Sequence, residues 1–387
     1  MARGFPVDRV AAIEFETLVR ILLIARCSPA ASLCRIDALR ASSDSHDQSR
    51  IADMAYKLTV QQFGEEIIVE DRETVLEAAL RKGLDFSFDC RSGVCGECKC
   101  ALVSGSVEMS PYLEVALEED ERLQGFILGC RSTLRSDCEI ALLDRDEDPT
   151  PAYRRVGAMV RSVDRVTHDI AIVKVETIGG KPFDFAPGQY ADVQFGDYPS
   201  RSYSFANVPG SSILEFHIRS TPSGAVSPQI YNHLKPGDRA LISGPRGMAY
   251  LRKRHPGPLV FCAGGSGLAP IASMVRSLAA SNSTVQGRVF FGVRKEEDVY
   301  LEQEICSLSD RLGWQPPVIA LSQDHTQTLR QRGFLADAVK QELSIGAGMK
   351  AYLCGPPIMI ETCRAALFSL GLRRQDCHAD VFWTPPS

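Results

Sequence analysis

In the stretch Cys90-Arg-Ser-Gly-Val-Cys95-Gly-Glu-Cys98, four residues separate the first two cysteines and two residues separate the next two. Cys130 follows after 31 intervening residues. Four cysteines with this spacing are typical of a loop that holds a 2Fe-2S cluster on thiolates. The backbone must curl around such a cluster, and the two glycines inside the stretch permit that curl because they have no side chain. We therefore predict that all four cysteines are iron ligands.

Two alternatives remain open at this loop. Cys95-x2-Cys98 is also half of a zinc knuckle, although zinc sites usually pair two short cysteine hooks and Cys130 stands alone. Cys100 follows the loop closely and could be a ligand, yet most buried cysteines behave as small hydrophobic residues. The remaining cysteines show no disulfide framework, which favours a reducing cytoplasm.

Length and composition limit the classes of protein. A chain of 387 residues is too long for one ordinary core and suggests two or three domains. Residues 54 to 147 carry 20 acidic and 10 basic side chains, a net charge of -10, which leaves +5 of the total -5 for the rest. This acidic part could dock on a basic partner or simply aid solubility. The chain has no stripe of basic residues, as a nucleic-acid-binding surface would need, and no apolar run long enough to span a bilayer. We also expect it to be a monomer.

Residues 1–53 are predicted to be an extension and not a folded domain. The apolar run Leu18 to Ala25 is short, is broken by Arg20 and follows Glu14 and Glu16, where a secretory signal would have positive charge. We interpret the segment as an upstream extension such as an overlong gene prediction would add, with a membrane-targeting arm as the alternative.

The first domain is predicted over residues 54–147 as a β-grasp ferredoxin fold. A hairpin over Tyr56 to Val69 precedes a helix over Thr74 to Lys82, the cysteine loop and a strand over Lys99 to Val107. The acidic run Glu118 to Glu121 is expected to form a solvated surface helix. The polar stretch Asp144 to Thr150, flanked by prolines, is expected to be an interdomain linker.

The second domain is predicted over residues 148–255 as a small antiparallel β-barrel, because short alternating strands are separated by Gly and Pro turns. It contains Arg201-Ser202-Tyr203-Ser204. The arginine can neutralise a pyrophosphate, the tyrosine can stack on a flat heterocycle, and a serine hydroxyl can bond the edge of that ring. Downstream, Gly224-Ala-Val-Ser227 precedes a short helix near Gln229 to Leu234, whose free N–H groups suit a second phosphate charge. Ser227 could equally be a helix N-cap.

The third domain is predicted over residues 256–387 as a Rossmann-like parallel α/β sheet. The buried strand Leu259 to Ala263 is followed by the turn Gly264-Gly265-Ser-Gly267 and by a helix over Ile271 to Ala280, which is the phosphate-facing unit of a nucleotide fold. Three further strands alternate with helices. The last strand runs into Cys354-Gly355-Pro356, where ligands of such sheets bind. Cys354 could instead be a hydrophobic strand end.

Taken in chain order, these motifs resemble those of the reductase components of bacterial aromatic-ring-hydroxylating oxygenases, of the naphthalene dioxygenase type. Such reductases are ferredoxin-NADP reductase-type flavoproteins with an N-terminal ferredoxin domain. The resemblance covers Met54 to the C-terminus, and further stretches that carry it are Thr167-His-Asp169, Phe185-Ala-Pro-Gly-Gln-Tyr190, Gly244-Pro-Arg-Gly-Met-Ala-Tyr-Leu-Arg252 and Phe291-Gly-Val-Arg294.

The resemblance implies roles for single residues. It implies that Arg201 binds the FAD pyrophosphate, that Tyr203 packs on the isoalloxazine and that Ser204 lies near its reactive nitrogen. Phe382 would cover the flavin, and Trp383 replaces the tyrosine that is usual in this family. Further implied contacts are Ser202 with the flavin, Gly224 and Ser227 with the other phosphate end, Gly264, Gly265 and Gly267 with the nicotinamide dinucleotide, and Cys354, Gly355 and Pro356 beside the nicotinamide ring. Ser204, Cys354 and Phe382 are thus the candidate catalytic residues.

Two residues leave alternatives open. Asp380 in the tail could be a surface charge or could lie near the flavin. Arg294 follows the second strand of the third domain, where an arginine can meet a 2'-phosphate and an acidic residue would prefer the bare ribose of NADH. We expect NADH as the coenzyme, with NADPH possible.

Electron counting explains the predicted set of FAD, 2Fe-2S cluster and NADH. Nicotinamide delivers two electrons together as hydride, a 2Fe-2S cluster accepts one, and flavin can mediate between them. The predicted path therefore runs from NADH through FAD and the cluster to a terminal oxygenase or an intermediary ferredoxin. Alternatives are the reductase of a di-iron monooxygenase for phenol, toluene or methane, and a non-catalytic electron carrier or redox sensor that uses the cluster alone.

Overall fold

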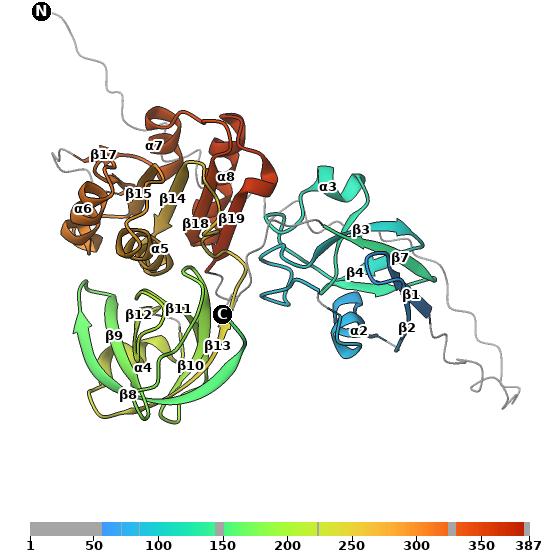
Figure 1. The fold of residues 1–387 in the computed structure, drawn as a ribbon, viewed down its shortest axis with the longest axis horizontal. Helices are drawn as coiled ribbons and strands as arrows, with labels where there is room; N and C mark the ends of the chain where they lie inside the picture. Colours follow the sequence, from blue (N-terminus) through green and yellow to red (C-terminus); the bar gives the residue numbers. More distant parts are fainter. Residues whose placement is uncertain are drawn as a thin grey trace, which may run out of the picture. The chain divides into compact units, whose positions relative to one another are not determined.

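A computed structural model describes residues 56–382, apart from 71, 85, 144–150, 223 and 324–329. The predicted N-terminal extension, the predicted linker at 144–150 and Trp383 lie outside the described residues. Three larger sheets, each with its own hydrophobic core, organise the described chain (Figure 1). Within these residues, no helix combines the length and the apolar character that crossing a membrane requires.

The first sheet has five strands in the order β2-β1-β7-β3-β5, with β1 parallel to β7 and the other pairs antiparallel. The predicted β-grasp arrangement is confirmed. Its elements are β1 (Tyr56–Val60), β2 (Glu65–Val69), α2 (Val75–Arg81), β3 (Lys99–Ser104), α3 (Glu119–Leu123), β5 (Phe126–Leu128) and β7 (Cys138–Leu142), with a separate ribbon of β4 (Val107–Met109) and β6 (Ser132–Leu134).

Local sequence explains where α2 begins. The Thr74 hydroxyl accepts a hydrogen bond from the Glu77 backbone N–H at 3.2 Å, and the Glu77 carboxylate accepts one from the Thr74 N–H at 2.9 Å. This reciprocal capping box satisfies two of the backbone donors that a helix start leaves unpaired. The helix then buries Val75, Leu76, Ala78 and Ala79 against the sheet, as its apolar spacing predicts.

The expected surface helix is present as α3, which has no buried residue, but Glu121 is not free in solvent. Its carboxylate lies 2.6 Å from Lys99 Nζ, and the two side chains are only 15% and 13% exposed. Glu118, just before the helix, pairs with Arg374 of the third sheet's region. Part of the acidic run is therefore used in ion pairs, because basic partners come from segments far away in the sequence.

The second sheet confirms the predicted antiparallel barrel. Its six strands lie in the order β11-β10-β13-β8-β9-β12, and an antiparallel bridge between Phe205 and Phe216 joins the two ends. Phe185 and Phe205 stack inside it with ring centroids 4.0 Å apart. Its elements are β8 (Arg154–Arg165), β9 (Ile170–Thr177), β10 (Tyr190–Phe195), β11 (Arg201–Ser204), β12 (Ile213–Arg219), α4 (Ser227–His233) and β13 (Arg239–Arg246).

The third sheet is parallel throughout, in the order β17-β16-β15-β14-β18-β19, which confirms the predicted Rossmann-like fold. Its elements are β14 (Leu259–Gly264), α5 (Leu268–Ala280), β15 (Gly287–Val293), α6 (Glu302–Arg311), β16 (Val318–Leu321), β17 (Gln331–Arg332), α7 (Leu335–Glu342), β18 (Lys350–Gly355), α8 (Pro357–Ser369) and β19 (Cys377–Val381), with short 3-10 turns over Gly265–Gly267, Glu296–Asp298 and Arg374–Asp376.

Both faces of this sheet are buried, as its near-continuous apolar strands predict. Phe261 of β14 belongs to the core that includes α5 and Ile305 of α6, whereas its neighbours Val260 and Cys262 belong to the core under α7 and α8. The helices thus cover the two faces in pairs. The carboxyl ends of β14 and β18, which are paired in register, meet at one edge, and the glycine turn and Cys354 lie there.

Candidate functional site

The cysteine loop turns backbone N–H groups toward its sulfur atoms. Cys90 Sγ accepts hydrogen bonds from the N–H groups of Val94 and Cys95, both at 3.3 Å, and of Ser92 at 3.4 Å. The Cys95 thiol, the Ser92 hydroxyl and the N–H groups of Ser92 and Val94 lower the pKa of Cys90 to about 4, although burial opposes them. Donors of this kind stabilise thiolate ligands, since they oppose the negative charge of a bound cluster.

The fourth cysteine reaches the same place from a distant segment. The N–H of Cys130 donates to Cys98 Sγ at 3.4 Å, although 32 positions separate the two residues. Both side chains are almost fully buried. Two of the predicted ligands therefore come together without a disulfide, since all cysteines of the described part are free thiols.

Two glycines make the loop possible. Gly93 and Gly96 have φ angles of 74° and 79°, in the region that side chains disfavour. A Cβ atom at Gly96 would lie 2.7 Å from the carbonyl oxygen of Ala116, and one at Gly93 would lie 2.8 Å from Tyr112 Cβ. The shape and the donor set of the loop fit a 2Fe-2S cluster. Cys100, the alternative ligand, lies on β3 in the hydrophobic core of the first sheet.

The Arg201–Ser204 segment forms β11 at the edge of the barrel. Arg201 is exposed and donates to its neighbour's carbonyl, that of Ser200, at 2.8 Å. Ser202 Oγ donates to Asp192 at 2.8 Å. The hydroxyl of Tyr203 is buried and has no hydrogen-bond partner among the described residues, and burial raises its pKa. A buried hydroxyl of this kind normally has a partner, so the segment fits a bound polar cofactor.

Ser204 connects the barrel to the parallel sheet. Its hydroxyl donates to Asp380 Oδ2 at 3.0 Å, and burial raises the pKa of Asp380 to about 6. Asp380 lies on β19 in register with Cys354 of β18. The structure thus brings Ser204, Cys354 and Asp380, which come from two separate sheets, to one place.

The glycine turn packs directly on the end of β18. A Cβ atom at Gly267 would lie 2.0 Å from the carbonyl oxygen of Cys354, so only glycine fits there. Gly265 has a φ of 55°. Cys354 is fully buried and burial raises the pKa of its thiol, which favours the protonated form. The turn and the strand end fit the phosphates and ring of a dinucleotide.

The residues after β18 are held by the chain's last described segment. The N–H of Phe382 donates to the carbonyl of Gly355 at 2.8 Å, and Phe382 is half-buried. Pro356 is exposed and immediately precedes α8. A Cβ atom at Gly264 would lie 3.0 Å from both Pro356 Cδ and Met359 Cε.

Ser227 is the first residue of α4 and not its N-cap, which is Val226. Its hydroxyl accepts a hydrogen bond from the Thr221 N–H at 3.0 Å and so closes the loop that precedes the helix. Within this loop, a Cβ atom at Gly224 would meet Ser227 Oγ at 3.0 Å.

Arg294, the residue considered for coenzyme choice, directly follows β15. It is exposed, and its backbone carbonyl accepts a hydrogen bond from the Gln323 N–H at 2.8 Å.

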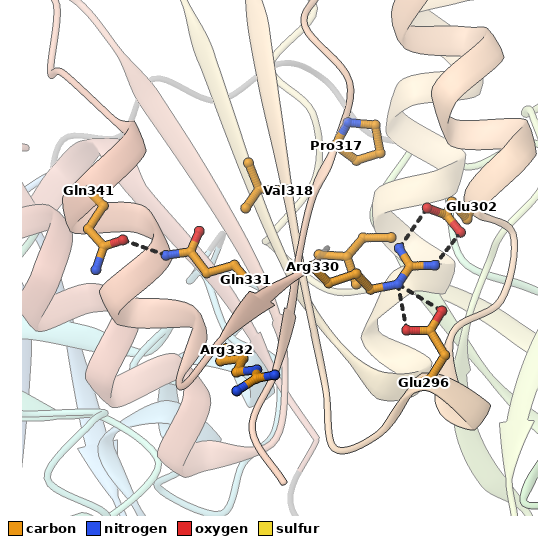
Figure 2. Close-up of a pocket in the computed structure, with 9 residues that line it drawn as sticks. Glu296, Glu302, Pro317, Val318, Arg330, Gln331, Arg332 and Gln341 are labelled. Carbon is orange, nitrogen blue, oxygen red and sulfur yellow. Dashed lines mark hydrogen bonds and ion pairs between the residues drawn. The ribbon is translucent and has the colours of Figure 1, made fainter. Parts of the chain in front are cut away.

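A hollow of about 910 Å³ lies at the β16–β17 edge of the parallel sheet (Figure 2). Arg330 crosses it and makes paired hydrogen bonds of 2.7–2.8 Å with the carboxylates of Glu296 and Glu302. Pro317 and Val318, which also line it, stand at the amino end of β16. Its lining includes neither a residue of the glycine turn nor Cys354, and we do not assign it to the dinucleotide.

Sequence reasoning missed a buried polar cluster between the barrel and the parallel sheet. Glu215 and His217 of β12 alternate with apolar residues, a pattern that predicts solvent exposure, but both are buried. They contact Arg276 and Tyr300 from the third domain. The Tyr190 hydroxyl also donates to Asp89, next to Cys90. For Asp89, the one signal in the sequence that could have indicated a functional role was its position next to the predicted ligand Cys90.

Family models match three consecutive parts of the chain. They are the 2Fe-2S iron-sulfur cluster binding domain over residues 58–135, the oxidoreductase FAD-binding domain over 158–250 and the oxidoreductase NAD-binding domain over 261–365. Each segment contains the corresponding motif described above. The match of the first model decides against the zinc alternative at the cysteine loop.

Curated relatives resemble almost the whole described chain. One is the ferredoxin–NAD(P)+ reductase component of naphthalene 1,2-dioxygenase/salicylate 5-hydroxylase systems from Ralstonia sp., 34% identical over 84% of this chain and 98% of its own length. Another is the reductase component of phenol 2-monooxygenase from Pseudomonas sp. (strain CF600), 34% identical over 86% of this chain and 95% of its own length.

Solved structures resemble the same region. An Amycolatopsis cytochrome P450 reductase has a TM-score of 0.65 at 29% identity and covers 84% of this chain and 98% of its own. A ferredoxin reductase in carbazole 1,9a-dioxygenase has a TM-score of 0.61 at 25% identity and covers 86% of this chain and 99% of its own.

Proposed function

Because the chain belongs to the family of reductase components of bacterial multi-component oxygenase systems, we propose that it carries electrons from NADH to an oxygenase that hydroxylates aromatic compounds. Membership of the family confirms the resemblance inferred from the motifs. The family models for FAD, NAD and 2Fe-2S domains make the chain an NAD(P)H-dependent oxidoreductase that transfers electrons.

The residues divide the work among three places. When bound, FAD accepts an electron pair from nicotinamide and releases single electrons, which a 2Fe-2S cluster can accept. Arg201 would hold the flavin pyrophosphate, Tyr203 would pack on the ring, and the glycine turn at Gly265 would receive the dinucleotide. Cys90, Cys95, Cys98 and Cys130 would hold the iron.

The observation that carries this proposal is the hydrogen bond between Ser204 and Asp380. It joins the strand of the proposed flavin motif to the strand beside Cys354, and this supports the proposal that flavin and nicotinamide react there. The Ser204 hydroxyl donates its proton to the hydrogen bond with Asp380 Oδ2. Since burial raises the pKa of Asp380 to about 6, this carboxyl can gain or lose a proton near neutral pH.

The oxygenase partner is the finer part of the proposal. An aromatic-ring-hydroxylating dioxygenase, or its ferredoxin, is favoured by the curated reductase from Ralstonia sp., of which this chain covers 98%. The phenol 2-monooxygenase reductase at the same identity supports the di-iron monooxygenase as the second candidate. Turnover with purified oxygenase components of each kind, measured as NADH-dependent hydroxylation, separates the two.

NADH is the proposed coenzyme, with NADPH also accepted. Arg294 is exposed directly after β15, where its guanidinium can meet a 2'-phosphate. The ratio of kcat/KM for the two coenzymes measures this preference. We also propose a monomer and a cytoplasmic location; the free thiols of the described cysteines support only the location.

The function is tested on the purified, cofactor-loaded protein with two acceptors. With NADH, the protein should reduce both ferricyanide, which can take electrons from the flavin alone, and cytochrome c, which takes them through the cluster. Cys95→Ser should lose iron and cytochrome c reduction and should keep ferricyanide reduction. Cys306→Ser, at a half-buried cysteine of α6, is the control and should keep both. Loss of both activities in Cys95→Ser would contradict separate flavin and cluster modules.

A further inference from the structure

Helix α5 holds the chain segment that leaves the flavin strand. Ser273 Oγ donates to the carbonyl oxygen of Asn207 at 2.7 Å, and Arg276 Nη1 donates to that of Ala206 at 2.8 Å. Ala206 lies two residues after Ser204, and Asn207 lies three residues after it. The same helix begins directly after the glycine turn over Gly265–Gly267. One rigid element therefore links the two motifs.

Arg276 is also the centre of an ion-pair cluster that is buried on the Glu215 side and partly exposed at Glu304. Its Nη1 lies 2.7 Å from Glu215 Oε1 on β12 of the barrel, and its Nε and Nη2 lie 2.6 and 2.9 Å from the carboxylate of Glu304 on α6. The side chains of Arg276 and Glu215 are only 15% and 10% exposed. Ion pairs shielded from water hold a fixed geometry, because leaving either charge unpaired is costly.

A second contact reinforces the same junction. The Tyr300 hydroxyl lies 3.0 Å from Nδ1 of His217 on β12 and 3.4 Å from the carbonyl oxygen of Gly265 in the glycine turn. Nε2 of His217 lies 3.1 Å from Glu215, so these contacts join the ion-pair cluster to the turn.

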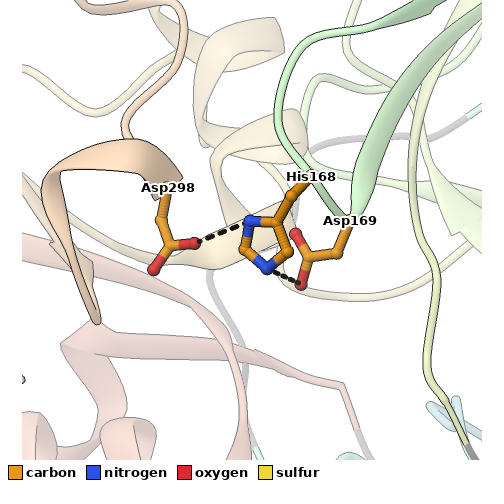
Figure 3. Close-up of side chains that lie close together, drawn as sticks. All are labelled: His168, Asp169 and Asp298. Atoms are coloured by element: carbon orange, nitrogen blue, oxygen red, sulfur yellow. Dashed lines mark ion pairs between the residues drawn. The ribbon is translucent and has the colours of Figure 1, made fainter.

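At the rim of the junction, His168 lies between Asp298 and Asp169 (Figure 3). His168 Nδ1 is 3.5 Å from Asp298, which belongs to the short turn before Tyr300. Asp169 is already paired with Arg219 at 2.7 Å. The Arg219 guanidinium already pairs with the Asp169 carboxylate, so we interpret the three side chains as a contact of the junction and not as a metal site.

Hydride transfer requires reacting atoms about 3–3.5 Å apart, and a misplacement of about 1 Å can cost about 100-fold in rate. We propose that Ser273 and Arg276 are positioning residues that set the distance between the flavin strand and the dinucleotide turn. They touch neither cofactor motif with their side chains, and they act by fixing the backbone after Ser204 relative to α5. The proposal rests on the function proposed above.

The test compares two serines of the same helix in the flavin-loaded protein. Ser273→Ala removes the donor to Asn207, whereas Ser277→Ala removes a buried hydroxyl that has no hydrogen-bond partner among the described residues. Flavin bleaching by NADH is followed by rapid mixing over a range of NADH concentrations. We expect the limiting rate of Ser273→Ala to fall about 10- to 100-fold, with NADH affinity within about 2-fold, and Ser277→Ala to match the unaltered chain.

An isotope effect and a conservative variant separate positioning from general damage. With NADH deuterated at the transferred position, Ser273→Ala should show an isotope effect at least as large as that of the unaltered chain, because hydride transfer limits the rate. Arg276→Lys keeps the charge but lacks the planar fork that makes these hydrogen bonds, so its limiting rate should fall below that of Ser277→Ala.

A measurement on the flavin-free chain checks the backbone directly. Hydrogen exchange at residues 205–208 should be faster in Ser273→Ala than in Ser277→Ala. The inference is overturned if the two serine variants agree in both limiting rate and exchange, or if Ser273→Ala changes only NADH affinity. Failure of the unaltered, flavin-loaded chain to react with NADH is a different result, which would overturn the proposed function itself.

Discussion

The Ser204 hydroxyl of the barrel donates a 3.0 Å hydrogen bond to the carboxylate of Asp380, which stands 176 positions later in the chain. Ser204 belongs to the motif proposed to hold flavin, and Asp380 lies in register with Cys354 beside the dinucleotide turn. This one hydrogen bond between side chains therefore lies where we propose that the two cofactors meet.

We predict that Asp380→Asn makes the flavin-free protein more stable above pH 6. Burial raises the pKa of this carboxyl from 3.8 to about 6, so between these values the folded state binds more protons than the unfolded state and stability falls as pH rises. Because the residue is only half-buried, we expect a gain of about 1 kcal/mol in the free energy of unfolding at pH 7. Denaturant titrations at pH 4 and pH 7 measure it.

The exposed Asp184→Asn serves as the control and should show no such pH dependence. A pH-independent difference for Asp380→Asn would count against a buried, titrating carboxyl. In the flavin-loaded protein, the same variant should lose any step near pH 6 in the rate of flavin reduction.

For Glu215→Gln we predict the opposite sign. Burial alone would raise the pKa of Glu215, but His217 and Arg276 lower it from 4.5 to about 2. The stability from this group is present above pH 4.5 and is lost as pH falls toward 2. Glu215→Gln should cost about 3 kcal/mol at pH 7, and the difference from the unaltered chain should shrink below pH 4.5.

Glu176→Gln provides the comparison for this prediction, because Glu176 forms an ion pair with the exposed Arg161 on the barrel surface. Exposed pairs contribute at most about 1 kcal/mol. Equal losses in the two variants would mean that burial of the Glu215 pair has no energetic consequence.

Arg201→Ala should weaken FAD binding. The guanidinium is exposed, and its one hydrogen bond among the described residues goes to the neighbouring carbonyl of Ser200, so it is available to a pyrophosphate. A hydrogen bond to a charged group contributes about 1.5–3 kcal/mol, which corresponds to a loss of about 10- to 100-fold in affinity. Fluorescence titration of the flavin-free protein measures this, and Arg161→Ala, which removes another barrel arginine, should leave the affinity unchanged.

Gly267→Ala should disrupt the proposed dinucleotide site. The added Cβ would lie 2.0 Å from the Cys354 carbonyl oxygen, so β18 and the turn must move apart. We expect a loss of about 1–3 kcal/mol in the free energy of unfolding together with weaker NADH binding. Gly346→Ala is the matched control, because a Cβ there meets nothing within 4 Å and should change neither quantity.

Local spacing explains what the sequence could predict. The cysteine loop and the glycine turn lie within short stretches, so residue types at fixed intervals indicated them. The strand β19 was not predicted, because Cys377–Val381 mixes polar and apolar residues and is only half-buried. The β17 strand has two residues, too few for any periodicity.

Glu215 and His217 show why the barrel–nucleotide junction could not be predicted. Their alternation with Leu214, Phe216 and Ile218 indicates a strand with one polar, solvated face. In the structure, α5 and α6 cover that face and supply Arg276 and Glu304. Which charges become buried depends on how distant elements pack, and this information is absent from the spacing of residues along one strand.

The central claim is that electrons pass from NADH through flavin to the cluster, and an anaerobic titration with NADH tests it most directly. The protein, loaded with FAD and iron, is followed by flavin absorbance and by electron paramagnetic resonance. We expect bleaching of the flavin and the appearance of a reduced 2Fe-2S signal, with only the bleaching left in Cys95→Ser. A bleached flavin without any iron-sulfur signal in the unaltered chain, or zinc in place of iron, would contradict it.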